Sequence, residues 1–116
     1  VVDGLLPIPL HSMRLRERGF NQSALLAEVM AAALLYPVRD DLLWRERATA
    51  PQVGLKPEER QRNVQGAFRA VPDAAGGAWL LVDDVCTTGA TLEASAHALR
   101  AQGARAVWAI TLARPF

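Results

Sequence analysis

The sequence predicts an α/β domain in which a mainly parallel, twisted sheet is flanked by helices, giving three layers. Residues 79–82 form an uninterrupted apolar run, which is typical of a strand that is buried on both faces. Residues 90–103 follow a helical pattern that ends at Gly103, and residues 106–112 are again apolar. This order of strand, helix and strand predicts a right-handed crossover between two parallel, buried strands.

The earlier part of the chain predicts a second strand and helix of the same kind. Residues 4–8 indicate a short strand that lies beside residues 79–82 and leads into an irregular loop, because prolines disfavour a longer central strand. The next helix begins at Asn21 or Ser23 as its N-cap and runs towards Pro37, with an apolar stripe that we expect in the core.

The middle of the chain predicts shorter elements. Residues 41–44 indicate a strand and residues 45–55 a loop without apolar periodicity. A short helix is expected from Pro57 towards Asn63, then a strand at residues 67–70 and a turn-rich connector at residues 72–77.

Length and composition predict one folded domain spanning residues 1–116. The chain is 51% hydrophobic and 22% charged, and its formal net charge of +1 gives no global attraction to nucleic acid. The longest apolar region, residues 24–38, is interrupted by Glu28 and is too short to span a membrane. Because the chain starts at Val1 rather than at methionine, we expect it to be the C-terminal part of a longer protein.

Cysteine and histidine content points to a reducing, cytoplasmic setting. The single cysteine, Cys86, excludes an internal disulfide. With two histidines, the chain also lacks the ligands for a conventional structural zinc site.

Two acidic residues and a threonine-rich turn lie between the predicted strand and helix. Asp83 and Asp84 stand at the carboxyl end of the strand, and residues 87–91 read Thr-Thr-Gly-Ala-Thr at the start of the helix. Backbone N–H groups in such a turn, next to the positive end of a helix dipole, form a site for a phosphate dianion. Carboxylates beside a phosphate suit sugar hydroxyls or Mg²⁺, so the pattern predicts a phosphoribosyl site.

Other phosphate-binding motifs do not fit these residues. A P-loop needs a lysine after its second glycine, whereas the only lysine is Lys56, and a dinucleotide fingerprint needs three spaced glycines where the turn has only Gly89. A response-regulator receiver needs a later lysine, and none follows Asp84. The structural alternative is that the aspartates cap a turn and the threonines cap a helix, but the joint pattern favours a phosphate site.

Residues 11–19 form a basic loop after the first predicted strand. They contain Arg14, Arg16 and Arg18, with Glu17 as the only acidic residue. Guanidinium groups suit bidentate contact with phosphate oxygens, although a solvated basic loop is the alternative for these residues alone. The loop is expected at the carboxyl ends of the strands, where open α/β sheets bind ligands.

Two stretches resemble a known family. LLVDDVCTTGAT resembles the phosphoribosyl pyrophosphate (PRPP) signature of type I phosphoribosyltransferases, and IPLHSMRLRERGFNQSALLA resembles the competence protein F (ComF) branch of that superfamily. The resemblance implies a type I phosphoribosyltransferase-like core whose base-recognition hood is absent or truncated. It implies that Asp83 and Asp84 are the catalytic pair and contact the ribose hydroxyls. It also implies that Mg²⁺ binds mainly through PRPP, with these two carboxylates as its candidate protein ligands.

The resemblance also implies the residues that bind the rest of PRPP. The implied 5′-phosphate loop comprises Val85, Cys86, Thr87, Thr88, Gly89, Ala90 and Thr91. The implied pyrophosphate loop comprises Leu10, His11, Ser12, Arg14 and Arg18. The implied flexible loop, which brings a cation to the pyrophosphate, offers Arg45, Arg47 and Lys56, each with a solvated surface position as its alternative.

Two functions follow from this interpretation. The first is a phosphoribosyltransferase domain that binds PRPP or ribose 5-phosphate and serves a nitrogen acceptor that the sequence does not identify. The second is a non-catalytic module that acts in DNA uptake or DNA utilisation through a protein partner such as a helicase. Direct DNA binding is not expected, because the chain lacks a continuous basic stripe, and a homodimer is the expected self-assembly.

Overall fold

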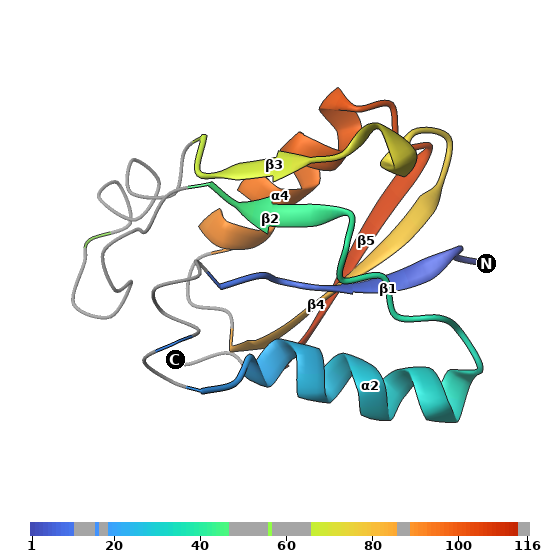
Figure 1. Ribbon diagram of the computed structural model, residues 1–116, viewed down its shortest axis with the longest axis vertical. Coiled ribbons are helices and arrows are strands. Elements are labelled where there is room, and N and C mark those ends of the chain that lie inside the picture. The colour runs from blue at the N-terminus through green and yellow to red at the C-terminus, as the bar shows by residue number, and fades with distance from the viewer. Residues whose placement is uncertain (11–15, 17–18, 47–55, 57–65, 86–88, 114–116) are drawn as a thin grey trace.

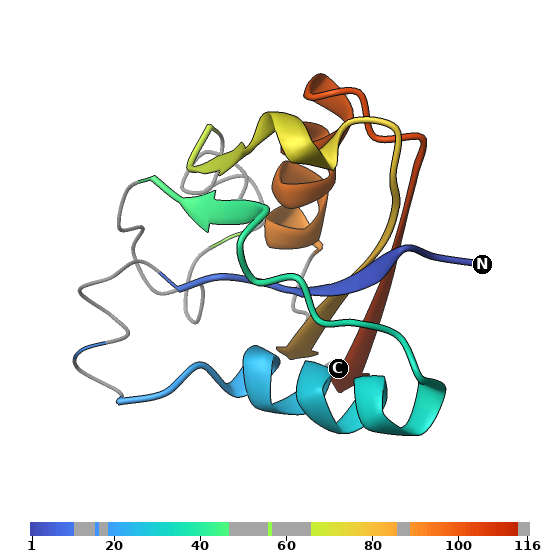
Figure 2. The same cartoon turned by 45° about the vertical axis from the view of Figure 1, so that its right-hand side comes forward.

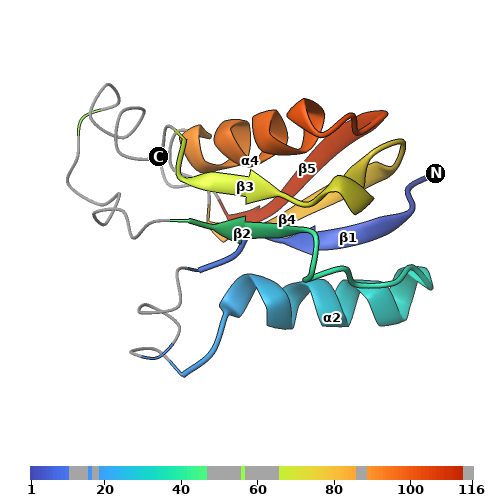
Figure 3. The ribbon, with the colours of Figure 1, turned by 45° about the horizontal axis from the view of Figure 1, so that its top comes forward.

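The computed structural model places a parallel sheet between two helices. It describes residues 1–10, 16, 19–46, 56, 66–85 and 89–113. The elements in chain order are β1 (Gly4–Pro7), α2 (Gln22–Leu34), β2 (Leu43–Arg45), β3 (Phe68–Ala70), the 3-10 helix η1 (Pro72–Ala74), β4 (Ala78–Val85), α4 (Ala90–Ala101) and β5 (Ala106–Ala113). Helices α2 and α4 cover opposite faces of the β1-β4-β5 sheet (Figures 1 and 3), so the predicted three-layer α/β class is confirmed.

Strand β4 is the centre of the sheet. It pairs in parallel with β1, where Leu5 lies opposite Leu80, and with β5, where Leu81 lies opposite Ala109. The three strands therefore run in one direction, which Figure 2 shows for β4 and β5. The predicted neighbourhood of residues 4–8 and 79–82 is confirmed by this register.

Two apolar layers hold the helices on the sheet. On one face, Ala27 of α2 packs with Leu5 and Val82, which are fully buried. On the other face, Leu99 of α4 packs with Leu81 and with residues of the small antiparallel β2-β3 sheet. Apolar surface is thus buried on both sides of β1 and β4, as expected for a parallel sheet.

Helix α2 buries only part of the apolar stripe that the sequence predicts, which comprises Leu25, Leu26, Val29, Met30, Ala33 and Leu34. Its buried residues are Ser23 and Ala27, while Leu25 and Val29 of the predicted core stripe are exposed. The helix ends at Leu35, which adopts a left-handed conformation with φ 61°, before Pro37 is reached. Leu26 and Met30 of the stripe are half-buried and pack against the core beside Ala27, so that part of the prediction is confirmed.

Two further predictions need correction at the edges of the fold. Strand β5 was expected to be buried, but it is an edge strand, and Trp108 and Leu112 are 50% and 73% exposed. Helix α2 packs on β1 and β4, so it leaves this face of β5 uncovered. The predicted strand at residues 41–44 lies instead at Leu43–Arg45, which moves Arg45 from the predicted loop into β2.

No helix in the described part of the chain has the length and apolar character of a membrane span.

Candidate functional site

The acidic pair lies at the carboxyl end of the central strand. Asp83 and Asp84 are the sixth and seventh of the eight residues of β4, so they belong to the strand rather than to a turn after Val82. The strand extends to Val85 because β5 pairs with it as far as Ala113. On the other side, the N–H of Ile8 donates to the carbonyl of Val82 at 2.9 Å, so the chain after β1 begins beside this pair.

Asp83 is held from the first turn of α2. The Ser23 hydroxyl donates to Oδ1 of Asp83 at 3.2 Å, and the backbone N–H of Asp84 donates to the same Oδ1 at 3.0 Å. The N–H of Asp84 also lies 3.3 Å from Oγ of Ser23, which accepts from it. Two groups from two elements, themselves joined by a hydrogen bond, therefore fix the orientation of one carboxylate.

The environment of Asp83 disfavours its charged form. The pKa of Asp83 is raised from 3.8 to about 6, chiefly by burial and also by the hydrogen bond and like charge of the neighbouring Asp84, while the hydrogen bonds from Ser23 and from the N–H of Asp84 oppose the shift. Carboxyl groups with shifted pKa values cluster at functional sites, where the carboxylate interacts with a ligand rather than stabilising the fold. The structure thus places an energetically costly acidic pair at one edge of the sheet.

Helix α4 begins next to this edge. Gly89 is its N-cap and adopts φ 85°, a left-handed conformation that residues with a Cβ rarely adopt. The helix has 12 residues, and the first N–H groups of any α-helix lack intrahelical acceptors and favour an anion. Ala90 is buried and Thr91 is half-buried in its first turn. Cys86, Thr87 and Thr88 of the predicted phosphate loop lie outside the described residues.

Two residues that flank the predicted pyrophosphate loop, Ile8 and Asn21, meet at the end of β1. Leu10 follows the carboxyl end of β1, and the side-chain amide of Asn21 donates to the carbonyl of Ile8 at 3.1 Å. The Oδ1 of Asn21 accepts from the N–H of Ala24 at 3.2 Å, so Asn21, and not Ser23, is the N-cap of α2. His11, Ser12, Arg14 and Arg18 lie outside the described residues, while Arg16 is exposed.

The predicted flexible-loop cations divide between two environments. The guanidinium of Arg45 lies 4.7 Å from the centre of the Phe68 ring, across the β2-β3 pair, so its contacts belong to the fold. Lys56 is exposed, and Arg47 lies outside the described residues. Of these three residues, the structure therefore describes one that packs within the fold and one that is exposed.

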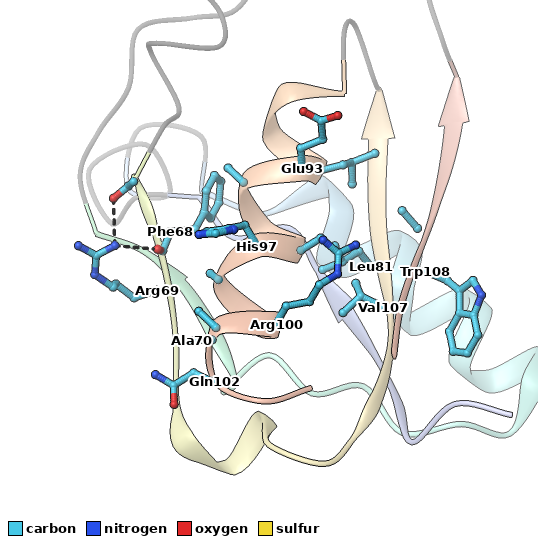
Figure 4. Close-up of a pocket in the computed structure, with 17 residues that line it drawn as sticks. Phe68, Arg69, Ala70, Leu81, Glu93, His97, Arg100, Gln102, Val107 and Trp108 are labelled. Atoms are coloured by element: carbon cyan, nitrogen blue, oxygen red, sulfur yellow. Dashed lines mark hydrogen bonds between the residues drawn. The ribbon is translucent and has the colours of Figure 1, made fainter. Parts of the chain in front are cut away.

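A groove of about 910 Å³ lies along α4 and is lined by residues of this helix, of β3 and of β5. Figure 4 shows Glu93, His97 and Arg100 following one another along the helix, with Phe68 and Arg69 on one flank and Val107 on the other. Among the residues that the structure describes, none of those predicted for the phosphoribosyl site lines this groove. The groove and the acidic edge are separate features of the molecule.

Ser23 is the residue of the site that sequence reasoning missed. The sequence offered it only as an alternative helix cap, whereas the structure shows it buried against Asp83. A signal was present, because Ser23 lies four residues before Ala27 and so shares the small-residue face of α2 that is buried.

Comparison with known proteins gives a family and several relatives. A family model described as Phosphoribosyl transferase domain matches residues 21–115. DNA utilization protein YhgH of Escherichia coli (strain K12) is 38% identical over 112 residues, which cover 97% of this chain and 49% of that protein. Competence protein F of Haemophilus influenzae is 32% identical over 115 residues, covering 97% of this chain and 50% of that protein.

A third relative and a solved structure agree with these matches. Competence protein ComFC of Bacillus subtilis (strain 168) is 35% identical over 112 residues, covering 95% of this chain and 44% of that protein. The chain thus spans about half the length of the curated relatives it matches. The structure of the allosteric regulatory enzyme of purine biosynthesis superposes with a TM-score of 0.60 at 21% identity, over 97% of this chain and 22% of that one, and shows the fold.

Proposed function

The chain belongs to the phosphoribosyl transferase domain family, and we propose that it binds PRPP at the carboxyl ends of β1 and β4. The observation that carries the proposal is the acidic pair, Asp83 and Asp84, held at the end of the central strand with Gly89 and the start of α4 beyond it. Carboxylates for the ribose and a helix N-terminus for the 5′-phosphate match the two chemically different ends of ribose 5-phosphate.

The proposed reaction is the transfer of the phosphoribosyl group to a nitrogen acceptor. The acceptor nitrogen attacks C1 of the ribose, the bond between C1 and the pyrophosphate oxygen breaks, and pyrophosphate leaves with the electron pair. The acceptor then loses its proton to solvent. Such transfer passes through a sugar with cationic character, so the protein contributes mainly orientation and electrostatic stabilisation.

Each part of the site has a proposed task. Asp83 and Asp84 accept hydrogen bonds from the ribose 2′- and 3′-hydroxyls and place negative charge near the cationic sugar. Residues 85–91 supply backbone N–H groups and threonine hydroxyls to the 5′-phosphate. Arg14 and Arg18 follow β1 in the sequence and are assigned to the pyrophosphate, with His11 and Ser12 beside them.

The donor set of the chain fits a magnesium ion that arrives with pyrophosphate. Asp83 and Asp84 offer carboxylate oxygens at the site, while the residues that the structure describes contain no group of three or more His, Cys, Asp or Glu side chains that could hold a metal on their own. Magnesium commonly binds through one or two carboxylates together with phosphate oxygens and water. When bound, the ion neutralises charge on the leaving pyrophosphate.

The test measures binding and turnover separately. With Mg²⁺ and PRPP at about 100 times its Kd, the domain should be stabilised by about 2.7 kcal/mol in thermal unfolding. Pyrophosphate release from PRPP is then measured against a panel of nucleobases, with the acceptor omitted as the control. If PRPP neither stabilises the domain nor binds in calorimetry, the proposal is wrong.

A second candidate function rests on the names of the relatives. YhgH is called a DNA utilization protein, and two other relatives are called competence proteins. We propose as the alternative a PRPP-binding module that acts in such a process through a protein partner, for which a DNA-uptake helicase is the candidate. Stabilisation by PRPP without pyrophosphate release from any nucleobase would favour this module, whereas release would favour the enzyme.

A further inference from the structure

Ser23 joins helix α2 to the acidic pair in a specific way. It is 5% exposed, lies in the first turn of α2, and is separated from Asp83 by 60 residues of sequence. Its hydroxyl accepts from the N–H of Asp84 and donates to Oδ1 of Asp83, so it forms a relay between two consecutive residues of β4. A group that accepts and donates at one atom is required, and a hydroxyl is the smallest side chain that does both.

The same turn of α2 is also tied to β1. Asn21 donates to the carbonyl of Ile8 at 3.1 Å and caps the helix through Ala24. One helical turn therefore connects the ends of two neighbouring strands, β1 and β4. In sequence, this turn follows directly after the arginine-containing residues 11–19.

We propose that Ser23 is a positioning residue that sets the Asp83 carboxylate for the ribose hydroxyls. The inference rests on the proposed function, because the ribose contact is part of that proposal. Ser23 does not itself touch the ligand. It acts by fixing Oδ1, since both of the hydrogen bonds that reach this carboxylate from Ser23 and from the N–H of Asp84 end on that oxygen.

The chain offers a matched control in a second buried serine. Ser95 of α4 is fully buried, and its Oγ has no hydrogen-bond partner among the residues that the structure describes. Replacing either serine by alanine removes one buried oxygen from a helix. Only the Ser23 replacement removes contacts to the acidic pair.

The experiment compares Ser23→Ala, Ser23→Thr and Ser95→Ala by calorimetry at one pH with Mg²⁺ present. The probes are PRPP, which carries the ribose hydroxyls, and inorganic pyrophosphate, which lacks them. Ser23→Ala should weaken PRPP by about tenfold, the loss expected when one hydrogen bond to a charged group is removed, while pyrophosphate changes by less than about twofold. Ser23→Thr keeps the hydroxyl and should recover most of the PRPP affinity, and Ser95→Ala should leave both probes unchanged.

Other outcomes would overturn the inference. Equal losses for PRPP and pyrophosphate would show that Ser23 supports the fold in general, and an unchanged PRPP affinity would show that it positions nothing. If the wild-type domain binds neither probe, the proposed function fails independently. Ser23 is then judged on the ligand-free protein, where Ser23→Ala must move the ¹³C carboxyl resonance of Asp83 and Ser95→Ala must not; an unmoved resonance rejects the positioning role.

Discussion

The two ends of β4 are served by aspartates in opposite circumstances. At the amino end, exposed Asp3 accepts a hydrogen bond from the buried N–H of Ala78 at 2.8 Å and lies 3.7 Å from Arg105. At the carboxyl end, Asp83 is buried beside a second aspartate, and burial is the main cause of its raised pKa. The Asp3 carboxylate supplies a hydrogen-bond acceptor that the fold needs, whereas the Asp83 carboxylate lies in a position where its charged form is disfavoured.

Other polar and apolar groups at the amino end of β4 also have close partners. The indole Nε1 of Trp79 donates to the carbonyl of Ala74 at 2.9 Å in a buried position. Gly77 packs so closely on this ring that a Cβ there would lie 2.2 Å from Cζ2 of Trp79. The satisfied contacts at the amino end can offset the free-energy cost of the buried carboxylate at the other end, as scaffolds commonly do for functional sites.

The largest effect should come from removing both charges at the carboxyl end. Asp83→Asn with Asp84→Asn should weaken PRPP by at least about 100-fold, because two hydrogen bonds from ribose to charged acceptors are weakened together. Folding should survive, since asparagine keeps an oxygen that accepts from Ser23 and from the N–H of Asp84. Calorimetry measures the affinity and circular dichroism the fold.

A matched control separates this site effect from net charge. Asp40 and Asp41 are also consecutive, but both are exposed. Asp40→Asn with Asp41→Asn changes the net charge equally and should leave PRPP affinity within about twofold, as expected for screened, distant charges. If the Asp83 and Asp84 double variant bound PRPP with unchanged affinity, the proposal that these carboxylates contact the ribose would be wrong.

The sequence predicts the central unit well because its signals are local. The apolar run before Asp83 and the helical pattern that ends at Gly103 each reflect one element, so the strand, the helix and their order follow from periodicity. The acidic pair was found by its spacing from Gly89, which is also local. Its placement at the edge of the sheet then follows from the direction of β4.

Features that depend on contacts between distant segments could not be predicted. The end of β4 at Val85 is set by pairing with β5, and the role of Ser23 requires a partner 60 residues away. The apolar residues of β5 indicate a preference for burial, but exposure of Trp108 depends on which helix covers that face. Periodicity reports what a segment prefers, and not whether its neighbours are present.

A smaller effect should appear in the pH dependence of stability. The folded-state pKa of Asp83, about 6, lies above its value of 3.8 in the absence of burial, so the folded state binds more protons between these values. Stability should therefore fall as the pH rises from about 4 to about 7, by up to about 3 kcal/mol from this group. Urea denaturation at several pH values measures the slope.

The single variant Asp83→Asn isolates this contribution. It should be more stable than the wild type at pH 7, because the buried charge is gone, and the gain should shrink towards pH 4, where wild-type Asp83 is neutral. Titrating groups that do not interact with Asp83 are common to both proteins and cancel in the difference, and the remaining slope reports the Asp83–Asp84 pair. A difference that does not vary with pH would mean that Asp83 carries no buried charge.

The smallest effect is expected at the amino end, where Asp3→Ala leaves the N–H of Ala78 without its acceptor. Because Ala78 is fully buried, the loss should be about 1–2 kcal/mol in urea denaturation. Asp3→Asn keeps an acceptor oxygen and should lose less, and Arg105→Ala should cost less than about 0.5 kcal/mol, because the ion pair is exposed. None of the three variants should alter PRPP affinity. If Asp3→Ala instead weakened PRPP, the two ends of β4 would be coupled, and the separation between a stabilising end and a binding end would be wrong.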